Sequence, residues 1–347
     1  MALDRANLLK LMKTTVAANP SSNYSFNGET FSYNALNDTL RNELNELVGT
    51  EELYQENKQK VFALISETVD EVLPPRLIDR YGQFAEIKTF GQGDKPVFTR
   101  RTGKVRAKQF ITRVGIAGRY ETFKLGMESF EVATSAMGGA AKIGFEEFLD
   151  GRVNFAELTQ IVMDGMDELL YREIAKALMG SITQLPAANR VSVAGFDEAG
   201  MDFLVNGASV YGAPVIYCTR EFAVKMIPDN GWVSDEMRNT RWQVGYLGNY
   251  KGCRVIVLPQ SFEDETNSMK VIDPGYIWII PAGADMRPVK VAFEGATHTR
   301  ECDDNDDWSR DIQIYRKVGV GVMMTNNIFS YVDTQLQGHL ENKYTPT

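Results

Sequence analysis

The stretch FAELTQIVMDGMDELLYREIAKALMG, from Phe155 to Gly180, decides what kind of fold this chain can adopt. Its apolar side chains recur every three to four residues, which is the spacing of one face of an α-helix. A helix from Phe155 to Met179 would be roughly 37 Å long at about 1.5 Å per residue. The apolar stripe starts further upstream and consists of Phe145, Phe148, Leu149, Phe155, Leu158, Ile161, Val162, Met166, Leu169, Leu170, Ile174 and Leu178.

This helix is expected to act as a structural spine that packs on strands between residues 289 and 325. The side chains expected to make that contact are Phe155, Leu158, Ile161, Val162, Leu169 and Ile174. A charge introduced at Leu169 would then lie unpaired in a core, at a cost of several kcal/mol.

Upstream of the spine, residues 1–49 contain too few large apolar side chains to form a core by themselves. We expect an N-terminal arm with a short helix from Ala35 to Leu47, mobile in a free subunit and ordered against a neighbour. A stronger helix follows, which Thr50 should cap and which Pro74-Pro75 should stop.

Residues 84–124 have the character of an extended β-hairpin loop without a core of its own. Glycines separate short apolar runs, and Lys104-Val105-Arg106-Ala107-Lys108 alternates charged with small apolar side chains, as a strand with one solvated face does. Between Lys95 and Lys124 there are nine basic residues against the single acid Glu121, a net charge of +8 in a chain of net charge −9. The acids must therefore gather elsewhere.

Two segments carry much of that negative charge. Residues 145–176 hold eight acids and three bases, and residues 301–311 hold six acids and one base. Opposite charges on separate surfaces favour contact between copies of the chain. We expect the bases to lie on a neighbour's acidic helix face or on its acidic 303–307 tip, the residues involved being Arg100, Arg101, Lys104, Arg106, Lys108, Asp303, Asp304, Asp306 and Asp307.

The C-terminal half divides into an α/β part and a β part. Residues 196–270 alternate a helix at Asp197–Tyr211 with strands at Pro214–Cys218 and Cys253–Leu258. Residues 271–335 are predicted to be strands, at Tyr276–Ile280, Val289–Phe293, Asp311–Val318 and Gly321–Thr325. Residues 336–347 are predicted to form a C-terminal tail.

The motifs indicate no catalytic, cofactor-binding or metal-ligating set. His298, expected in a loop, and His339 are the only histidines, and neither has a second histidine or cysteine at ligand spacing. An EF-hand loop starting at Asp303 would need glycine where Trp308 stands and glutamate where Ile314 stands. A solvated acidic tip explains that run better than a loosely held cation. Glycine motifs for phosphate binding or a nucleophilic serine are also missing.

The composition is that of an ordinary globular protein, with 44 % hydrophobic and 24 % charged residues. A pI near 5.0 argues against a protein whose main task is to wrap nucleic acid. The cysteines Cys218, Cys253 and Cys302 match no metal or redox spacing, so a reduced compartment without disulfides is expected. No export signal is evident, and no apolar stretch approaches the ~20 residues of a membrane span. We therefore expect no membrane partner.

The order of these segments resembles that of the major capsid proteins of tailed double-stranded-DNA bacteriophages, which share the Hong Kong 97-type fold with encapsulins. The resemblance covers roughly residues 50–335. It rests first on the basic hairpin before a long helix, which ends in Leu170-Tyr171-Arg172-Glu173-Ile174-Ala175-Lys176-Ala177-Leu178-Met179-Gly180. In the α/β unit that follows, Gly245-Tyr246-Leu247-Gly248 leads to Gly252-Cys253-Arg254-Val255-Ile256-Val257. The final β segments contain Phe293-Glu294-Gly295 and Ile312-Gln313-Ile314-Tyr315-Arg316-Lys317-Val318-Gly319-Val320-Gly321.

The resemblance implies an α+β fold with an extended β-hairpin loop, a long spine helix, a peripheral α+β domain and an axial α/β domain. The hairpin loop would lie over a neighbouring subunit. The segments would be the N-terminal arm (1–49), a helix leading into the peripheral domain (50–83), the hairpin loop (84–124), the spine helix (125–195), the axial domain (196–270), the peripheral-domain sheet (271–335) and the tail (336–347).

The resemblance also implies a structural role and neither enzymatic activity nor a cofactor. Copies of the chain would form hexamers and pentamers of an icosahedral virion shell, after assembly in the host cytoplasm. The shell would enclose packaged double-stranded DNA without sequence-specific binding. A portal is implied, and decoration proteins are further candidates. Residues 1–49 are too short for the fused scaffolding segment of some relatives, so a separate scaffolding protein is expected.

Three other functions stay open at this point. An encapsulin, the shell of a cellular compartment, would have the same fold. Encapsulins are usually shorter and lack an added arm, so residues 1–49 favour the virus. A nucleic-acid-binding module built on residues 95–124 and an enzyme with an unrecognised site are the others. The acidic total and the missing motifs speak against both.

Overall fold

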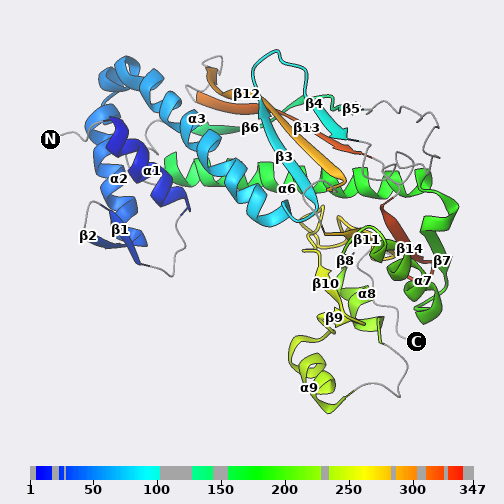
Figure 1. Cartoon of the computed structure of the whole chain (residues 1–347). Coiled ribbons are helices and arrows are strands. Elements are labelled where there is room, and N and C mark those ends of the chain that lie inside the picture. The colour runs from blue at the N-terminus through cyan, green and yellow to red at the C-terminus, as the bar shows by residue number, and fades with distance from the viewer. Residues whose placement is uncertain are drawn as a thin grey trace, which may run out of the picture.

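The computed structural model describes residues 5–17, 23–26, 29–101, 127–143, 155–227, 234–282, 287–302, 310–323 and 327–338. Long helices lie beneath a four-stranded sheet, and a six-stranded sheet with its own short helices forms a second unit (Figure 1). Two two-stranded ribbons complete the described strands. In one of them, β1 (Asn23–Phe26) pairs with β2 (Glu29–Ser32) near the N-terminus.

The N-terminal segment belongs to the subunit core, so the expectation that it packs only against a neighbour is wrong. Helices α1 (Arg5–Ala17) and α2 (Tyr33–Val48) pack on α3 (Glu51–Tyr81), and α1 also contacts the spine helix. Each helix has one narrow apolar stripe that is insufficient alone but is buried when the helices share it. The buried side chains are Leu8, Leu11, Met12, Val16, Leu36, Leu40, Leu44 and Val48.

Helix α3 begins where the sequence predicts but continues through both prolines. The Thr50 hydroxyl accepts a hydrogen bond from the Leu53 N–H at 3.3 Å, which confirms the predicted cap. Each interior proline removes a backbone donor and costs about 3 kcal/mol. Leu73, Leu77 and Tyr81 are nevertheless buried on the same face, before and after Pro74-Pro75. Burial of that continuous stripe outweighs the local preference to stop.

The spine helix is α6 (Phe155–Ser181), in agreement with the predicted period. The segment before it was expected to be helical, but it forms β5 (Met127–Glu131) and β6 (Ser135–Ile143). Strand β6 is rich in glycine and alanine, and its backbone pairs with a neighbouring strand along its full length. No local sequence pattern predicts this pairing, because the partner strand is far away in the sequence.

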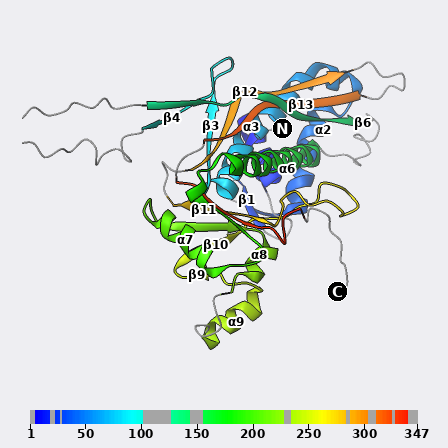
Figure 2. The same cartoon turned by 90° about the vertical axis from the view of Figure 1, so that its right-hand side faces the viewer.

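The four-stranded sheet has the order β3-β12-β13-β6. Strand β3 (Ala85–Phe90) runs parallel to β12 (Val289–Cys302), and β13 (Arg310–Val322) is antiparallel to both β12 and β6. Helix α3 lies against β12 and β3, and α6 lies against β13 and β6, as the view nearly along α6 shows (Figure 2). The two strands predicted within 311–325 are a single strand. His298, expected in a loop, lies in β12 opposite Tyr315.

The sheet covers only part of the expected spine. Ile174 is buried and Val162 is partly buried against the core, but Ile161 is 62 % exposed and Leu169 is 41 % exposed. The side chains of Phe155 and Leu158 lie outside the described residues. The expected burial is therefore wrong for Ile161, and Leu169 is largely exposed although it borders the strands of the sheet. From Thr159 onward, the buried positions of the helix are Thr159, Met163, Met166, Asp167, Leu170, Tyr171, Ile174, Ala175, Leu178 and Ser181.

The six-stranded sheet has the order β7-β14-β11-β8-β10-β9. Two of its strands come from the segment that was assigned to the peripheral sheet, so the assignment of all of 271–335 to one sheet is wrong. Which sheet each of these strands joins depends on pairing partners that are distant in the sequence. The strands are β7 (Arg190–Val193), β8 (Pro214–Cys218), β9 (Asn249–Tyr250), β10 (Cys253–Val257), β11 (Tyr276–Pro281) and β14 (Phe329–Asp333).

Helices α7 (Glu198–Ser209) and α8 (Arg220–Lys225) pack on this second sheet. The Asp197 carboxylate caps α7 by accepting from the Gly200 N–H at 2.9 Å. The shared core contains Met201, Leu204, Phe222, Ile277, Ile279 and Tyr331. The predicted helices and strands of residues 196–270 therefore share one sheet, which β7 joins from before them and β11 and β14 from further along the chain.

An aromatic cluster joins the two units. The Tyr171 ring of α6 stacks on Tyr81 of α3 with centroids 5.5 Å apart, and its hydroxyl donates to the Pro259 carbonyl at 2.6 Å. Phe84 meets Tyr217 of β8 edge-on at 5.4 Å. Burial raises the pKa of Tyr217 to about 12, so its hydroxyl stays protonated at neutral pH. These contacts tie the spine helix to the second sheet.

We predict opposite outcomes for two adjacent substitutions in α6. Leu170 is 1 % exposed, so Leu170→Asp buries an unpaired charge and should lower the free energy of unfolding by several kcal/mol. Leu169→Asp, at a half-open position, should change it by about 1 kcal/mol or less. Urea unfolding of both variants measures the difference. Equal losses would mean that α6 buries a different face.

Candidate assembly surfaces

A two-stranded ribbon projects from the four-stranded sheet (Figure 2). Strand β4 (Val97–Arg101) pairs antiparallel with β5, with Val97 opposite Glu131 and Arg101 opposite Met127. The predicted hairpin strand around Val97 is thus present, but its partner lies beyond the expected limit at residue 124. The preceding β3 belongs to the sheet itself.

The root of the ribbon rests on a small apolar cluster of its own. Phe98, Val132 and Ala292 are buried together, with Phe90 and Phe130 packed against them. This separate cluster anchors the ribbon apart from the main core beneath the helices.

Two glycines of β13 make this close approach possible. A Cβ at Gly321 would lie 2.7 Å from the Phe130 ring, and one at Gly319 would collide with the Ala133 carbonyl. Any other residue at these positions would push the ribbon away from the sheet.

Charged side chains surround the same root. The ammonium groups of Lys88 and Lys290 lie 5.2 and 5.8 Å from the centroid of the Phe98 ring, and both pair with Glu86. Burial pushes the pKa of Glu86 upward, but hydrogen bonds from the two lysines outweigh it and hold that pKa below its ordinary value. Glu86 therefore stays ionised at neutral pH.

Of the expected basic and acidic contact residues, the structure describes only Arg100 and Arg101. Arg100 and Arg101 occupy the last positions of β4, opposite Glu128 and Met127. Lys104, Arg106, Lys108 and the acids Asp303, Asp304, Asp306 and Asp307 lie outside the described residues. The acidic run joins β12 to β13, whose paired ends are Cys302 and Asp311.

The far end of the second unit carries a short exposed helix. Helix α9 (Asp235–Val244) lies away from the rest of the molecule, and none of its residues is buried (Figure 1). Ser234 caps it by accepting from the Met237 N–H at 3.3 Å, as its sequence position predicts. Its Trp242 is 91 % exposed, and Val244 and Val224 are also exposed. Exposed apolar groups gathered at one tip are typical of a contact surface.

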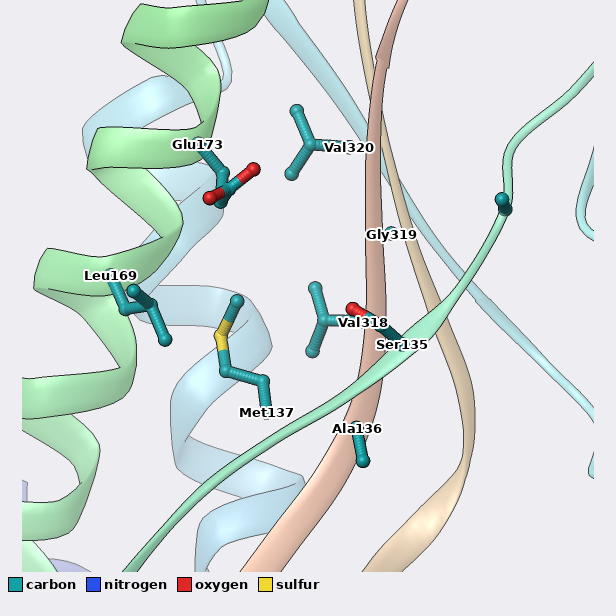
Figure 3. Close-up of a pocket in the computed structure, with 9 residues that line it drawn as sticks. Ser135, Ala136, Met137, Leu169, Glu173, Val318, Gly319 and Val320 are labelled. Carbon is teal, nitrogen blue, oxygen red and sulfur yellow. The ribbon is translucent and has the colours of Figure 1, made fainter.

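A hollow of about 200 Å³ opens between α6 and the edge of the four-stranded sheet (Figure 3). Leu169 and Glu173 border it on the helix, and Met137, Val318 and Val320 border it on the strands. A second hollow of about 490 Å³ lies between α3, α6 and residues 259–261. There Arg76 pairs with Asp164 at 2.5 Å and Arg80 pairs with Asp167.

No group of three or more potential metal ligands is found among the described residues. Cys218 and Cys253 are buried free thiols, and burial raises the pKa of Cys218 to about 12. None of the helices within the described ranges is both long and apolar enough to cross a membrane.

Comparison with known proteins gives one family and a shared fold. The family model described as "SPbeta prophage-derived putative capsid protein YonB" matches residues 7–333. No curated protein matches the chain. A phage-related protein from Bordetella bronchiseptica RB50 is 15 % identical, with a TM-score of 0.50 over 79 % of this chain and 97 % of that chain. That likeness shows the same fold along nearly the whole of the Bordetella protein.

Two capsid structures are similar at lower TM-scores. The mature capsid of bacteriophage PhiM1 is 9 % identical, with a TM-score of 0.49 over 74 % of this chain and 87 % of that chain. The capsid of a native GTA particle is 12 % identical, with a TM-score of 0.48 over 73 % of this chain and 89 % of that chain.

We predict that the ribbon root depends on the glycine beneath it. Gly321→Val would overpack Phe130 and should cost about 1–3 kcal/mol in the free energy of unfolding. Gly139→Val is the matched control, because a Cβ there meets open space. Thermal and urea unfolding report the cost. A harmless Gly321→Val would show that the ribbon does not rest on β13.

Proposed function

The chain belongs to the capsid-protein family whose model matches residues 7–333, and on that premise we propose that its copies form the hexamers and pentamers of an icosahedral shell around double-stranded DNA. The protein is a structural major capsid protein of the Hong Kong 97-type fold, and its place is the virion. Its long spine helix, projecting ribbon and two sheets are the parts expected of that fold.

The exposed tip at α9 is the observation that carries the proposal. A tryptophan that is 91 % exposed leaves a large apolar side chain in water, and α9 contributes nothing to the subunit core. Several copies meeting around one axis would cover that side chain repeatedly. Asp235 and Glu236 in the first turn, with Arg238 and Arg241 beyond them, give each copy both charges for its neighbours.

The ribbon supports a second contact between copies. Residues 95–124 carry a net charge of +8, whereas residues 145–176 and 301–311 each carry −5. Among the acids of α6, Asp164, Glu168 and Glu173 are exposed. We assign the basic ribbon to the acidic helix face or the 303–307 tip of an adjacent subunit. Each exposed pair contributes only about 0–1 kcal/mol, but a shell repeats the contact many times.

The proposal includes partners other than the chain itself. Residues 5–48 contain helices that are buried in the subunit core, so they are unsuited to serve as a removable scaffolding segment. A separate scaffolding protein is therefore part of the proposal. A portal, decoration proteins and packaged DNA, held without sequence-specific contacts, complete it. An encapsulin shell is the alternative, and it would contain protein cargo in place of DNA.

The test is assembly of the full chain, expressed together with the genes that flank it. Sedimentation and electron microscopy should show closed particles with hexamers and pentamers, and nuclease-protected DNA should be recovered from filled particles. Particles that contain only protein cargo would favour the encapsulin alternative. A 38.9 kDa monomer under all scaffold and salt conditions would overturn the proposal.

We predict that Trp242→Ser leaves the subunit folded but impairs assembly. Its side chain is almost fully exposed, so the free energy of unfolding should change by about 0.5 kcal/mol or less. The yield of closed particles should fall at least tenfold. Gln243→Ala, an exposed neighbour in the same helix, is the control and should assemble normally. Normal yield from both variants would remove α9 from the contacts between copies.

We predict that reversing the charge of the ribbon prevents closure of the shell. Replacing Arg100, Arg101 and Arg106 by Glu should leave a soluble, folded subunit without closed particles. Partial rescue is expected from reversing Asp303, Asp304, Asp306 and Asp307, or acids along residues 146–168. Particle yield is measured by sedimentation.

The matched control for this charge reversal changes three exposed lysines elsewhere. Replacing Lys10, Lys60 and Lys176 by Glu alters the net charge equally and should permit assembly. If ribbon-reversed subunits built shells of normal stability that failed to retain DNA, the ribbon would instead be a DNA-binding segment.

A further inference from the structure

One buried carboxylate lies where both strands of the ribbon meet the sheet. Glu294 of β12 is 9 % exposed. Its Oε1 accepts from the Gly93 N–H at 3.2 Å and from the Lys317 ammonium at 3.1 Å, and its Oε2 accepts from the Thr134 hydroxyl. Gly93 precedes β4 and Thr134 follows β5. A single side chain therefore binds the incoming and the outgoing ends of the ribbon.

The backbone around Glu294 is shaped for this contact. Gly93 has a φ of +84°, and Gly295 has a φ of +71°, conformations that favour glycine. A Cβ on Gly295 would lie 3.3 Å from the Cβ of Gln92, so the turn before β4 passes close to β12. The pairing of β12 with β13 shifts register between Glu294 and His298. The irregularity begins directly at the carboxylate that binds the ribbon.

The charge of Glu294 is stabilised by its partners. The hydrogen bond from Thr134, followed by those from Lys317 and the Gly93 N–H, holds the pKa of Glu294 below its ordinary value. The group is therefore ionised at neutral pH and accepts all three hydrogen bonds. Charge-assisted hydrogen bonds of this kind are stronger and shorter than neutral ones.

Apolar side chains also support the root, and their contacts are less directional. Phe98 and Val132 are buried in the small cluster, and Phe130 lies over Gly321. Apolar packing resists separation of the ribbon from the sheet but permits the two to slide past each other. Three hydrogen bonds to one carboxylate instead fix the orientation of the ribbon ends relative to β12. The root therefore sets the direction in which β4 and β5 leave the sheet.

We propose that Glu294 is a positioning residue for shell assembly, because its carboxylate fixes the direction in which the ribbon leaves the subunit. The inference rests on the proposed function, in which residues 95–124 contact a neighbouring subunit. In this role Glu294 does not touch the neighbour. It selects one ribbon direction before the neighbour arrives, so that less conformational entropy is lost when subunits associate.

The test combines hydrogen exchange on the free subunit with assembly of the full chain. In Glu294→Ala, amide exchange of residues 91–97 and 129–134 should accelerate at least tenfold while exchange in α6 stays unchanged. The yield of closed particles should fall at least tenfold, or particles of abnormal size should form. Thr134→Val removes one of the three donors at similar side-chain volume and should give a smaller effect in the same direction.

Two controls separate positioning from loss of charge and from general damage. Glu131→Gln removes an exposed carboxylate from the same ribbon and should leave exchange and assembly normal. Glu294→Gln keeps the side-chain size and one acceptor oxygen, so it should restore part of the assembly lost in Glu294→Ala. If Glu294→Ala does not fold, Thr134→Val and Glu294→Gln carry the test alone.

The outcomes distinguish this inference from the proposed function. Fast exchange at the root together with normal shells would overturn the positioning role while shell assembly itself stands. Unchanged exchange at the root would overturn it as well. Failure of the unaltered chain to form shells would overturn the proposed function, and the positioning role with it.

Discussion

A buried carboxylate on the spine helix is the contact on which the rest of the subunit depends. Asp167 of α6 is nearly inaccessible, accepts from the Tyr81 hydroxyl at 2.9 Å and pairs with Arg80 of α3. Such a group is tolerated inside a protein only when its partners are held in place. Its geometry therefore fixes α3 against α6, and the two helices together carry the four-stranded sheet. One turn further along α6, Tyr171 joins the same frame to the second sheet.

The rigidity of this frame explains where the exposed features lie. Apolar packing closes the interior of both units, and the α9 tip, the ribbon and the open side of α6 lie outside it. A subunit of a shell must hold its contact surfaces at constant distances, since each contact is repeated by symmetry. The long helix α6 contacts both units and meets this requirement, because it holds the contact surfaces of one unit at a constant distance from those of the other.

The sequence and the structure agree wherever short-range signals dominate. The cap at Thr50 and the helical period of α6 follow from local hydrogen bonding and residue spacing. They disagree where distant contacts override local preference. Pro74-Pro75 does not stop α3 because Leu77 and Tyr81 are buried beyond it, and residues 127–143 are strands because they pair with β4 and β13. No local pattern marks Glu294 as the group that binds both ends of the ribbon.

By itself, the sequence determined the long amphipathic helix, the alternation of helices and strands after it, the basic charge of the ribbon segment and, through the order of segments, the capsid family. Only the tertiary structure decided which side of α6 is covered, which of the late strands join which sheet, and that α1 and α2 belong to the core. Ile161 and Leu169 belong to the apolar stripe of α6, yet their side chains are 62 % and 41 % exposed. The physical reason is that period and capping are properties of neighbouring residues, whereas strand pairing and burial depend on chain segments brought together only by folding.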